Sequence, residues 1–176
     1  MGTTVSTLVI RDEWAYIAQV GDSRVYVARN GDIFQQITED HSLVAEQIRE
    51  GYLTEEEARN HSLRNLITRA VGIKETIEVD LYALRIKQGD TILLCSDGLS
   101  NMVSDLEMQE SLGNGNLQGA GRVLVGRALE NGAPDNVTVV LVRVAEPPGK
   151  SQPDAGAEMV RLGRKGLLGS LKKLIS

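Results

Sequence analysis

The chain contains few aromatic residues and a single cysteine. Among its 176 residues there are one Trp, one Phe and four Tyr. Proteins that bind single-stranded nucleic acid stack bases on aromatic side chains, so this composition argues against nucleic-acid binding. Cys95, standing alone, excludes an internal disulfide and a zinc site built from cysteines. We therefore expect a reducing compartment, the cytoplasm.

Long hydrophobic runs are also missing. The longest, residues 137–142 with Thr138 inside it, is far shorter than the roughly 20 residues that span a membrane. Residues 1–4 show neither a basic start nor an apolar block, so we expect no signal peptide. The hydrophobic content of 41% is enough for the core of one domain.

Charge is unevenly distributed along the chain. The formal net charge is -5, but residues 1–149 carry 13 basic and 22 acidic residues, whereas residues 150–176 have a net charge of +4. An acidic body argues against binding a phosphate backbone. It is compatible with cation binding, or simply with a solvated surface.

The pattern of apolar residues predicts strands followed by helices and then strands again. Alternation predicts an antiparallel meander near the N-terminus, with an Asn30-Gly31 hairpin turn in it. Capping residues and acidic first turns predict helices, two of them over residues 40–50 and 54–72. The last strand is too apolar to have one face in water. The predicted strands are residues 5–10, 14–20, 24–29, 33–37, 77–84, 91–95 and 137–144, and the other helices are residues 106–112 and 117–129.

This order of elements predicts an α+β fold in layers rather than a regular βαβ series. Residues 1–146 form the predicted domain, and residues 147–160 a polar linker. Residues 161–176 have the spacing of a basic amphipathic helix. We expect this tail to dock on the domain; weak contact with a membrane surface or a partner is the alternative.

Three aspartates follow or precede predicted strands beside small residues. Asp97 comes after an apolar strand and before Gly98, Asp135 precedes the last strand, and Asp22 lies between two strands. Each has an ordinary explanation on its own: a helix N-cap for Asp97, a turn for Asp135 and a hairpin loop for Asp22. If the strand ends converge, the carboxylates repel one another unless a cation lies among them. Hard oxygen ligands without His or Cys favour Mg²⁺ or Mn²⁺.

Five short segments, in this order, resemble the metal-dependent type 2C (PPM) serine/threonine protein phosphatases in their bacterial form. They are residues 20–24 (VGDSR), 38–42 (TEDHS), 68–72 (TRAVG), 93–99 (LLCSDGL) and 135–138 (DNVT). The resemblance implies a layered sandwich of two antiparallel β-sheets flanked by helices. Residues 40–72 resemble the mobile flap beside the active site in that family.

The same resemblance implies a metal centre and a reaction. A water held by Mn²⁺ or Mg²⁺ would attack phosphoserine or phosphothreonine in protein targets of a serine/threonine kinase. Asp97 and Asp135 match catalytic ligands of the second metal, and Asp22 matches a ligand of a third, weaker site shared with Asp97. Two or three ions are thus implied, and we expect a monomer.

Several other polar residues receive structural interpretations. The family places its general acid in an upstream segment, so we expect His41 and His61 to lie at a helix start or on the surface. Cys95 is expected to be a buried apolar residue. For Arg24 an ion pair within its turn is expected rather than phosphate binding.

The segment with which the family begins has no match in this chain. That segment carries a phosphate-binding arginine and an Asp-Gly-Met-Gly-Gly-His type motif, whose Asp bridges two metals. We therefore expect a sandwich whose first strands are missing, from a phosphatase whose N-terminal segment is absent here, with negligible turnover by these residues alone. The alternatives are a non-catalytic regulatory or phosphopeptide-binding module and a plain acidic domain with a membrane-touching tail.

Overall fold

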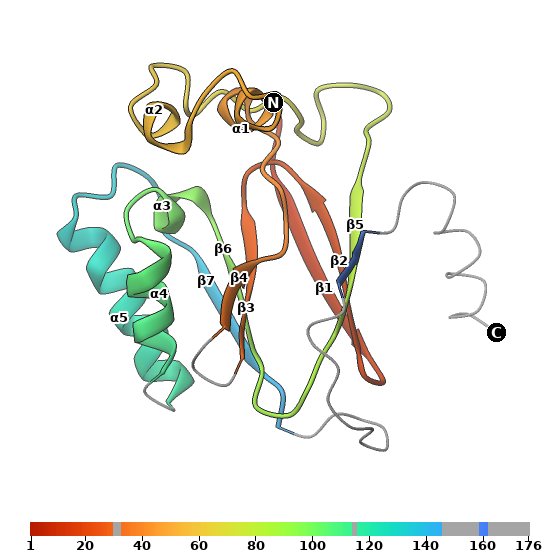
Figure 1. The fold of residues 1–176 in the computed structure, drawn as a ribbon, viewed down its shortest axis with the longest axis vertical. Coiled ribbons are helices and arrows are strands. Elements are labelled where there is room, and N and C mark those ends of the chain that lie inside the picture. The colour runs from red at the N-terminus through yellow and green to blue at the C-terminus, as the bar shows by residue number, and fades with distance from the viewer. Residues whose placement is uncertain (30–32, 114–115, 146–158, 162–176) are drawn as a thin grey trace.

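The computed structural model describes residues 1–29, 33–113, 116–145 and 159–161. Two four-stranded antiparallel sheets face each other, with helices outside one of them (Figure 1). This confirms the prediction of an α+β sandwich. The first sheet has the order β1(Val5–Arg11), β2(Trp14–Val20), β5(Asp80–Arg85) and β8(Met159–Arg161), and the second has the order β4(Ile33–Gln36), β3(Arg24–Arg29), β6(Thr91–Cys95) and β7(Val139–Arg143).

The sequence predicted that the first four strands form one meander, but they do not. β1 and β2 pair in the first sheet, β3 and β4 pair in the second, and the chain crosses between sheets at residues 21–23. β3 also pairs with β6, in a register that places Arg24 opposite Cys95. Alternation predicts where a strand lies, but its partners depend on contacts between residues far apart in the sequence.

The main core lies between the two sheets. Inward-facing side chains of β2 and β5 pack against those of β3 and β6, and Ala15, Val25, Leu84 and Ile92 are fully buried there. Burying a valine, leucine or isoleucine side chain in this core contributes about 1.5–3 kcal/mol to the free energy of unfolding. This core fixes the distance between the sheets, and with it the loops at their ends.

A second core lies between the second sheet and the helices. α4(Asp105–Leu112) and α5(Leu117–Glu130) cover its outer face (Figure 1), and Leu93, Met108 and Leu124 are fully buried between them. Cys95 also lies in this core, where burial raises the pKa of its thiol to about 12. It is therefore the buried apolar residue that the sequence predicted.

The predicted helix over residues 54–72 is mostly wrong. α2(Glu55–Arg59) begins at a capping box between Thr54 and Glu57, but it ends after five residues. The apolar side chains expected on its buried face are exposed: Leu63 by 46% and Leu66 by 49%. A helical spacing without a surface to bury it does not sustain a helix. α1(Leu43–Arg49), by contrast, forms as predicted, capped by Ser42.

The C-terminal strands also differ from expectation. β7 is an edge strand, and the side chain of Val140 is 49% exposed, so one face of this strand does meet water. Residues 159–161 form β8, paired with β5, where the end of a linker and the start of a helix were predicted. The rest of that linker and tail, and the Asn30-Gly31 turn, lie outside the described residues. No helix in the described part of the chain is long and apolar enough to cross a bilayer.

A buried ion pair joins the two sheets at one end of the sandwich. The Arg29 guanidinium donates to both carboxylate oxygens of Asp90, at 2.8 and 2.7 Å, and to the carbonyl oxygen of Arg85 at 2.9 Å. The two side chains are 4% and 1% exposed. The backbone N–H of Lys87 also donates to Asp90. Each charge therefore depends on the other for its solvation.

Asp90→Ala is expected to lower the free energy of unfolding by about 3–5 kcal/mol, because it leaves the Arg29 charge buried without its partner. Urea denaturation followed by circular dichroism measures this. Glu13→Ala is the matched control, since it removes an ion pair with Arg85 of equal length (2.7 Å) between partly exposed side chains. Its effect should stay below about 1 kcal/mol. Equal losses in the two variants would contradict the prediction.

Candidate metal centre

Asp97 lies where β6 ends and a short helix begins. α3(Asp97–Ser100) has Ser96 as its N-cap, so Asp97 is the first helical residue and not the cap itself. The amide nitrogen of Asn101 lies 3.5 Å from one oxygen of the Asp97 carboxylate. The side chain of Asp97 is half-buried at the end of the sandwich over which α1 and α2 also lie (Figure 1). The helix N-cap explanation for this residue is therefore wrong.

Asp22 lies in the connection between β2 and β3, close enough to Asp97 for the two charges to interact. The strand pairing ends at Arg24 and Cys95, and each aspartate lies two residues beyond that last pair. Burial and the negative charge of Asp97 together raise the pKa of Asp22 to about 6. A partly buried carboxylate beside a second negative charge is favourable ground for a cation.

Two glycines allow the loops at this end to approach one another closely. Gly21 has a φ of 107°, and a Cβ there would overlap the side chain of Thr4. A Cβ on Gly98 would lie 2.5 Å from the backbone oxygen of Asn136. Any larger residue at either position would force the two loops that meet there to separate.

Asp135 lies in the loop that packs against the start of α3. Ser96 joins the two loops: its hydroxyl donates to the carbonyl of Asn136 at 3.1 Å and accepts from the N–H of Thr138 at 3.0 Å. The carboxylate of Asp135 accepts from the N–H of Asn136 at 2.6 Å. Its side chain is exposed. This geometry agrees with the turn explanation, and it also leaves Asp135 on the loop next to Asp97.

The structure thus brings Asp22 and Asp97 face to face and places Asp135 on a neighbouring loop. In the part of the chain that the structure describes, no group of three or more His, Cys, Asp or Glu side chains is arranged to hold a metal. The donors fit Mg²⁺ or Mn²⁺ in kind, because all are carboxylate oxygens. They are too few for a complete coordination shell. The assignment of all three aspartates as ligands stays a prediction.

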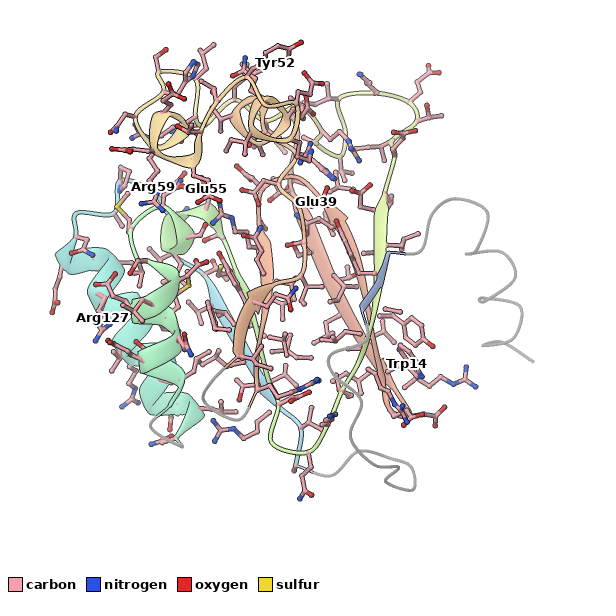
Figure 2. The ribbon with its side chains drawn as sticks, viewed as in Figure 1. Trp14, Glu39, Tyr52, Glu55, Arg59 and Arg127 are labelled. Atoms are coloured by element: carbon pink, nitrogen blue, oxygen red, sulfur yellow. The ribbon has the colours of Figure 1, made fainter. Side chains whose placement is uncertain are left out.

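Arg24 forms a structural ion pair, although not within its own turn. Its guanidinium donates to both oxygens of Asp40, at 3.0 and 2.7 Å, and to the hydroxyl of Tyr26 at 3.1 Å. Gln36 also donates to Asp40, at 3.1 Å. With its donors engaged in this way, Arg24 holds the start of the flap against β3. Glu39, beside Asp40, lies beneath α1, whereas Trp14 lies at the opposite end of the sandwich (Figure 2).

Comparison with known proteins decides the family. A family model described as protein phosphatase 2C matches residues 1–122. The serine/threonine phosphatase stp of Listeria innocua is 43% identical over 143 residues, which cover 81% of this chain and 56% of that protein. The chain belongs to the protein phosphatase 2C family. This confirms the resemblance drawn from the five short segments.

Solved structures of the protein phosphatase 2C family share the fold. The PstP/Ppp phosphatase of Mycobacterium tuberculosis has a TM-score of 0.76 and 40% identity, over 80% of this chain and 59% of that one. The catalytic domain of PstP in complex with two manganese ions has a TM-score of 0.73 and 38% identity, over 80% of this chain and 58% of that one. Phosphatases of this family are metal-dependent enzymes. The chain spans somewhat more than half the length of the relatives it matches.

His41 lies at a helix start, as expected, directly before the N-cap Ser42 of α1. What the sequence did not show is that its side chain is buried, at 1% exposure. Its Nδ1 lies 3.1 Å from the backbone nitrogen of Gly21, and its Nε2 lies 3.2 Å from a carboxylate oxygen of Asp80. Burial is the main cause that lowers its pKa. The signal available in the sequence was its place between Asp40 and Ser42, in a segment that carries the family resemblance.

His61, the other histidine, has a local role. Its Nδ1 accepts from the N–H of Leu63 at 3.2 Å, inside the irregular segment that follows α2. That contact agrees with the structural interpretation.

Asp22→Asn is expected to stabilise the metal-free protein near neutral pH. The pKa of Asp22 is raised from 3.8 to about 6, so stability from this group is fully present below the lower value and is lost as the pH rises through the upper one. The amide carries no charge, which gives a gain of about 1 kcal/mol near neutral pH after solvent screening. Near pH 4 the gain should largely disappear.

Thermal unfolding in chelator-containing buffer at the two pH values measures this effect. Asp12→Asn is the control, because Asp12 lies in an exposed turn at a φ of 52°, which asparagine also adopts readily. Its melting temperature should change little at either pH. A variant at residue 22 that is no more stable than the wild type near neutral pH would show that the folded protein does not disfavour the charged form of Asp22.

Proposed function

We propose that this chain forms part of a metal-dependent serine/threonine protein phosphatase, which hydrolyses phosphoserine and phosphothreonine. The observation that carries the proposal is the partly buried carboxylate of Asp22 beside the charge of Asp97, an arrangement that a cation would stabilise. Membership of the protein phosphatase 2C family supports the same conclusion.

The aspartates have separate roles in this proposal. Asp97 and Asp135 would hold one divalent ion, and Asp22 would share a further, weaker ion with Asp97. When bound, Mn²⁺ or Mg²⁺ supplies an activated water and stabilises charge on phosphoryl oxygens. Arg24 takes no part in binding phosphate, because its donors are directed at Asp40 and Tyr26.

The remaining features belong to the same proposal. Substrates would be phosphorylated proteins produced by a serine/threonine kinase, and the enzyme would act as a monomer in the cytoplasm. The basic residues of the tail, 161–176, would give at most a weak contact with a membrane surface. Manganese and magnesium both accept carboxylate oxygens, so these donors suit either ion.

The chain by itself should show negligible turnover of a phosphothreonine peptide with Mn²⁺, because the family motif with the bridging aspartate has no counterpart in its sequence. A phosphate-release assay on the purified chain measures this. Robust turnover that is abolished by Asp97→Asn would show that the motif is dispensable.

Activity is expected once the missing motif is supplied. In a chimera, the N-terminal part of the Listeria innocua phosphatase that this chain does not match is joined in front of residue 1. The chimera should hydrolyse the peptide with Mn²⁺, and Asp97→Asn should lower kcat/KM by at least about 100-fold. Asp105→Asn, at the exposed start of α4, is the matched control and should leave activity unchanged. A folded chimera that binds the peptide but never hydrolyses it would favour the phosphopeptide-binding module instead.

A further inference from the structure

The side chain of His41 joins the loop that carries Asp22 to β5. Its Nδ1 faces the N–H of Gly21 at 3.1 Å, and its Nε2 faces Asp80 at 3.2 Å. The other carboxylate oxygen of Asp80 accepts from Arg69 at 3.0 Å. His41 is 1% exposed, so water does not compete for these contacts.

The direction of these hydrogen bonds follows from the chemistry of the partners. A backbone N–H can only donate, so Nδ1 of His41 must be the unprotonated, accepting nitrogen. Nε2 then carries the proton and donates it to Asp80. The imidazole is therefore neutral and is held in one tautomer, and a protonated Nδ1 would break the contact with Gly21.

His41 makes hydrogen bonds to both the N–H and the carbonyl oxygen of Gly21. Its N–H donates to the imidazole, and its carbonyl oxygen accepts from the backbone N–H of His41 at 2.9 Å. Gln19 donates to the same oxygen at 3.0 Å. Gly21 directly precedes Asp22, and its φ of 107° sets the direction in which the chain leaves β2. The orientation of Asp22 thus depends on these two contacts.

The same residue holds the flap. The carbonyl oxygen of His41 accepts from the N–H of Thr68 at 2.8 Å. Two residues further on, the N–H of Leu43 donates to the carbonyl oxygen of Leu66 at 2.9 Å. Arg69 follows Thr68 and pairs with Asp80, at a distance of 3.0 Å. His41 therefore contacts, through different atoms, the Asp22 loop and the segment that follows α2.

We propose that His41 is a positioning residue for the weaker cation site: by accepting the Gly21 N–H, its imidazole orients the Asp22 carboxylate toward Asp97. The cation site in this inference rests on the proposed function. The hydrogen bond between Gly21 and His41 does not rest on it, because it involves only groups of this chain.

Two substitutions separate the two nitrogens of the imidazole. In His41→Asn the side-chain oxygen takes the place of Nδ1, so the bond from Gly21 is kept and the bond to Asp80 is lost. In His41→Gln the side-chain nitrogen takes the place of Nε2, so the bond to Asp80 is kept and the bond from Gly21 is lost. Each variant removes one hydrogen bond of the His41 side chain and keeps the other, so similar losses of stability are expected, and stability serves as the internal control.

The readouts are hydrogen exchange of the Gly21 amide and broadening of the Asp22 and Asp97 NMR signals by Mn²⁺ alone. With asparagine, Gly21 protection and the Mn²⁺ midpoint should stay within about threefold of the wild type, relative to global stability. With glutamine, both should weaken by about tenfold, the equivalent of one hydrogen bond. Nitrogen NMR of the wild-type imidazole should show a proton on Nε2 and none on Nδ1.

Equal effects of the two variants on Gly21 and on Mn²⁺ would overturn the proposal, because a residue that only fills space does not distinguish its nitrogens. So would loss of Gly21 protection in the glutamine variant with an unchanged Mn²⁺ midpoint, or a proton on Nδ1 in the wild type. Failure of the proposed function is seen separately, as an inactive chimera in the phosphate-release assay. The exchange and broadening measurements require no turnover.

Discussion

The repulsion between the carboxylates of Asp22 and Asp97 is the constraint on which this end of the molecule depends. Like charges that are partly buried disfavour each other, and here burial together with the charge of Asp97 raises the pKa of Asp22 to about 6. The close packing of the neighbouring glycines restricts how far the two loops can separate. Gly21 lies against Thr4, and Gly98 lies against the backbone of Asn136.

The sandwich supplies the rigidity that this arrangement requires. β3 and β6 pair in the centre of the second sheet and are buried on both sides, between the first sheet and the helices. Asp22 and Asp97 lie at the ends of these two strands, so their separation follows from the strand register. The ion pair of Arg29 with Asp90 ties the sheets together near the other end of β3 and β6. Side chains supported in this way keep their positions through the packing of the whole sheet.

Polar contacts, rather than apolar packing, connect the flap to this framework. Arg24 holds Asp40, and His41 holds Gly21 and Asp80. The segment after α2 keeps Leu63 and Leu66 largely exposed. A segment attached by a few hydrogen bonds, with its apolar side chains in water, belongs to the less stable part of a fold. Such a segment can change its position without disturbing either core.

The amino-acid sequence by itself determined most strands and helices, the α+β class, the burial of Cys95 and the family, because alternation, capping residues and short segments are local properties. It overestimated the length of the helix after Thr54, because periodicity does not show whether the apolar face of a helix has a surface to pack against. Only the tertiary structure decided that β2 and β3 belong to different sheets, that Asp22 faces Asp97, and that His41 is buried between Gly21 and Asp80. Those facts depend on contacts between residues 20 to 75 positions apart, whose pairing is set by the packing of whole sheets.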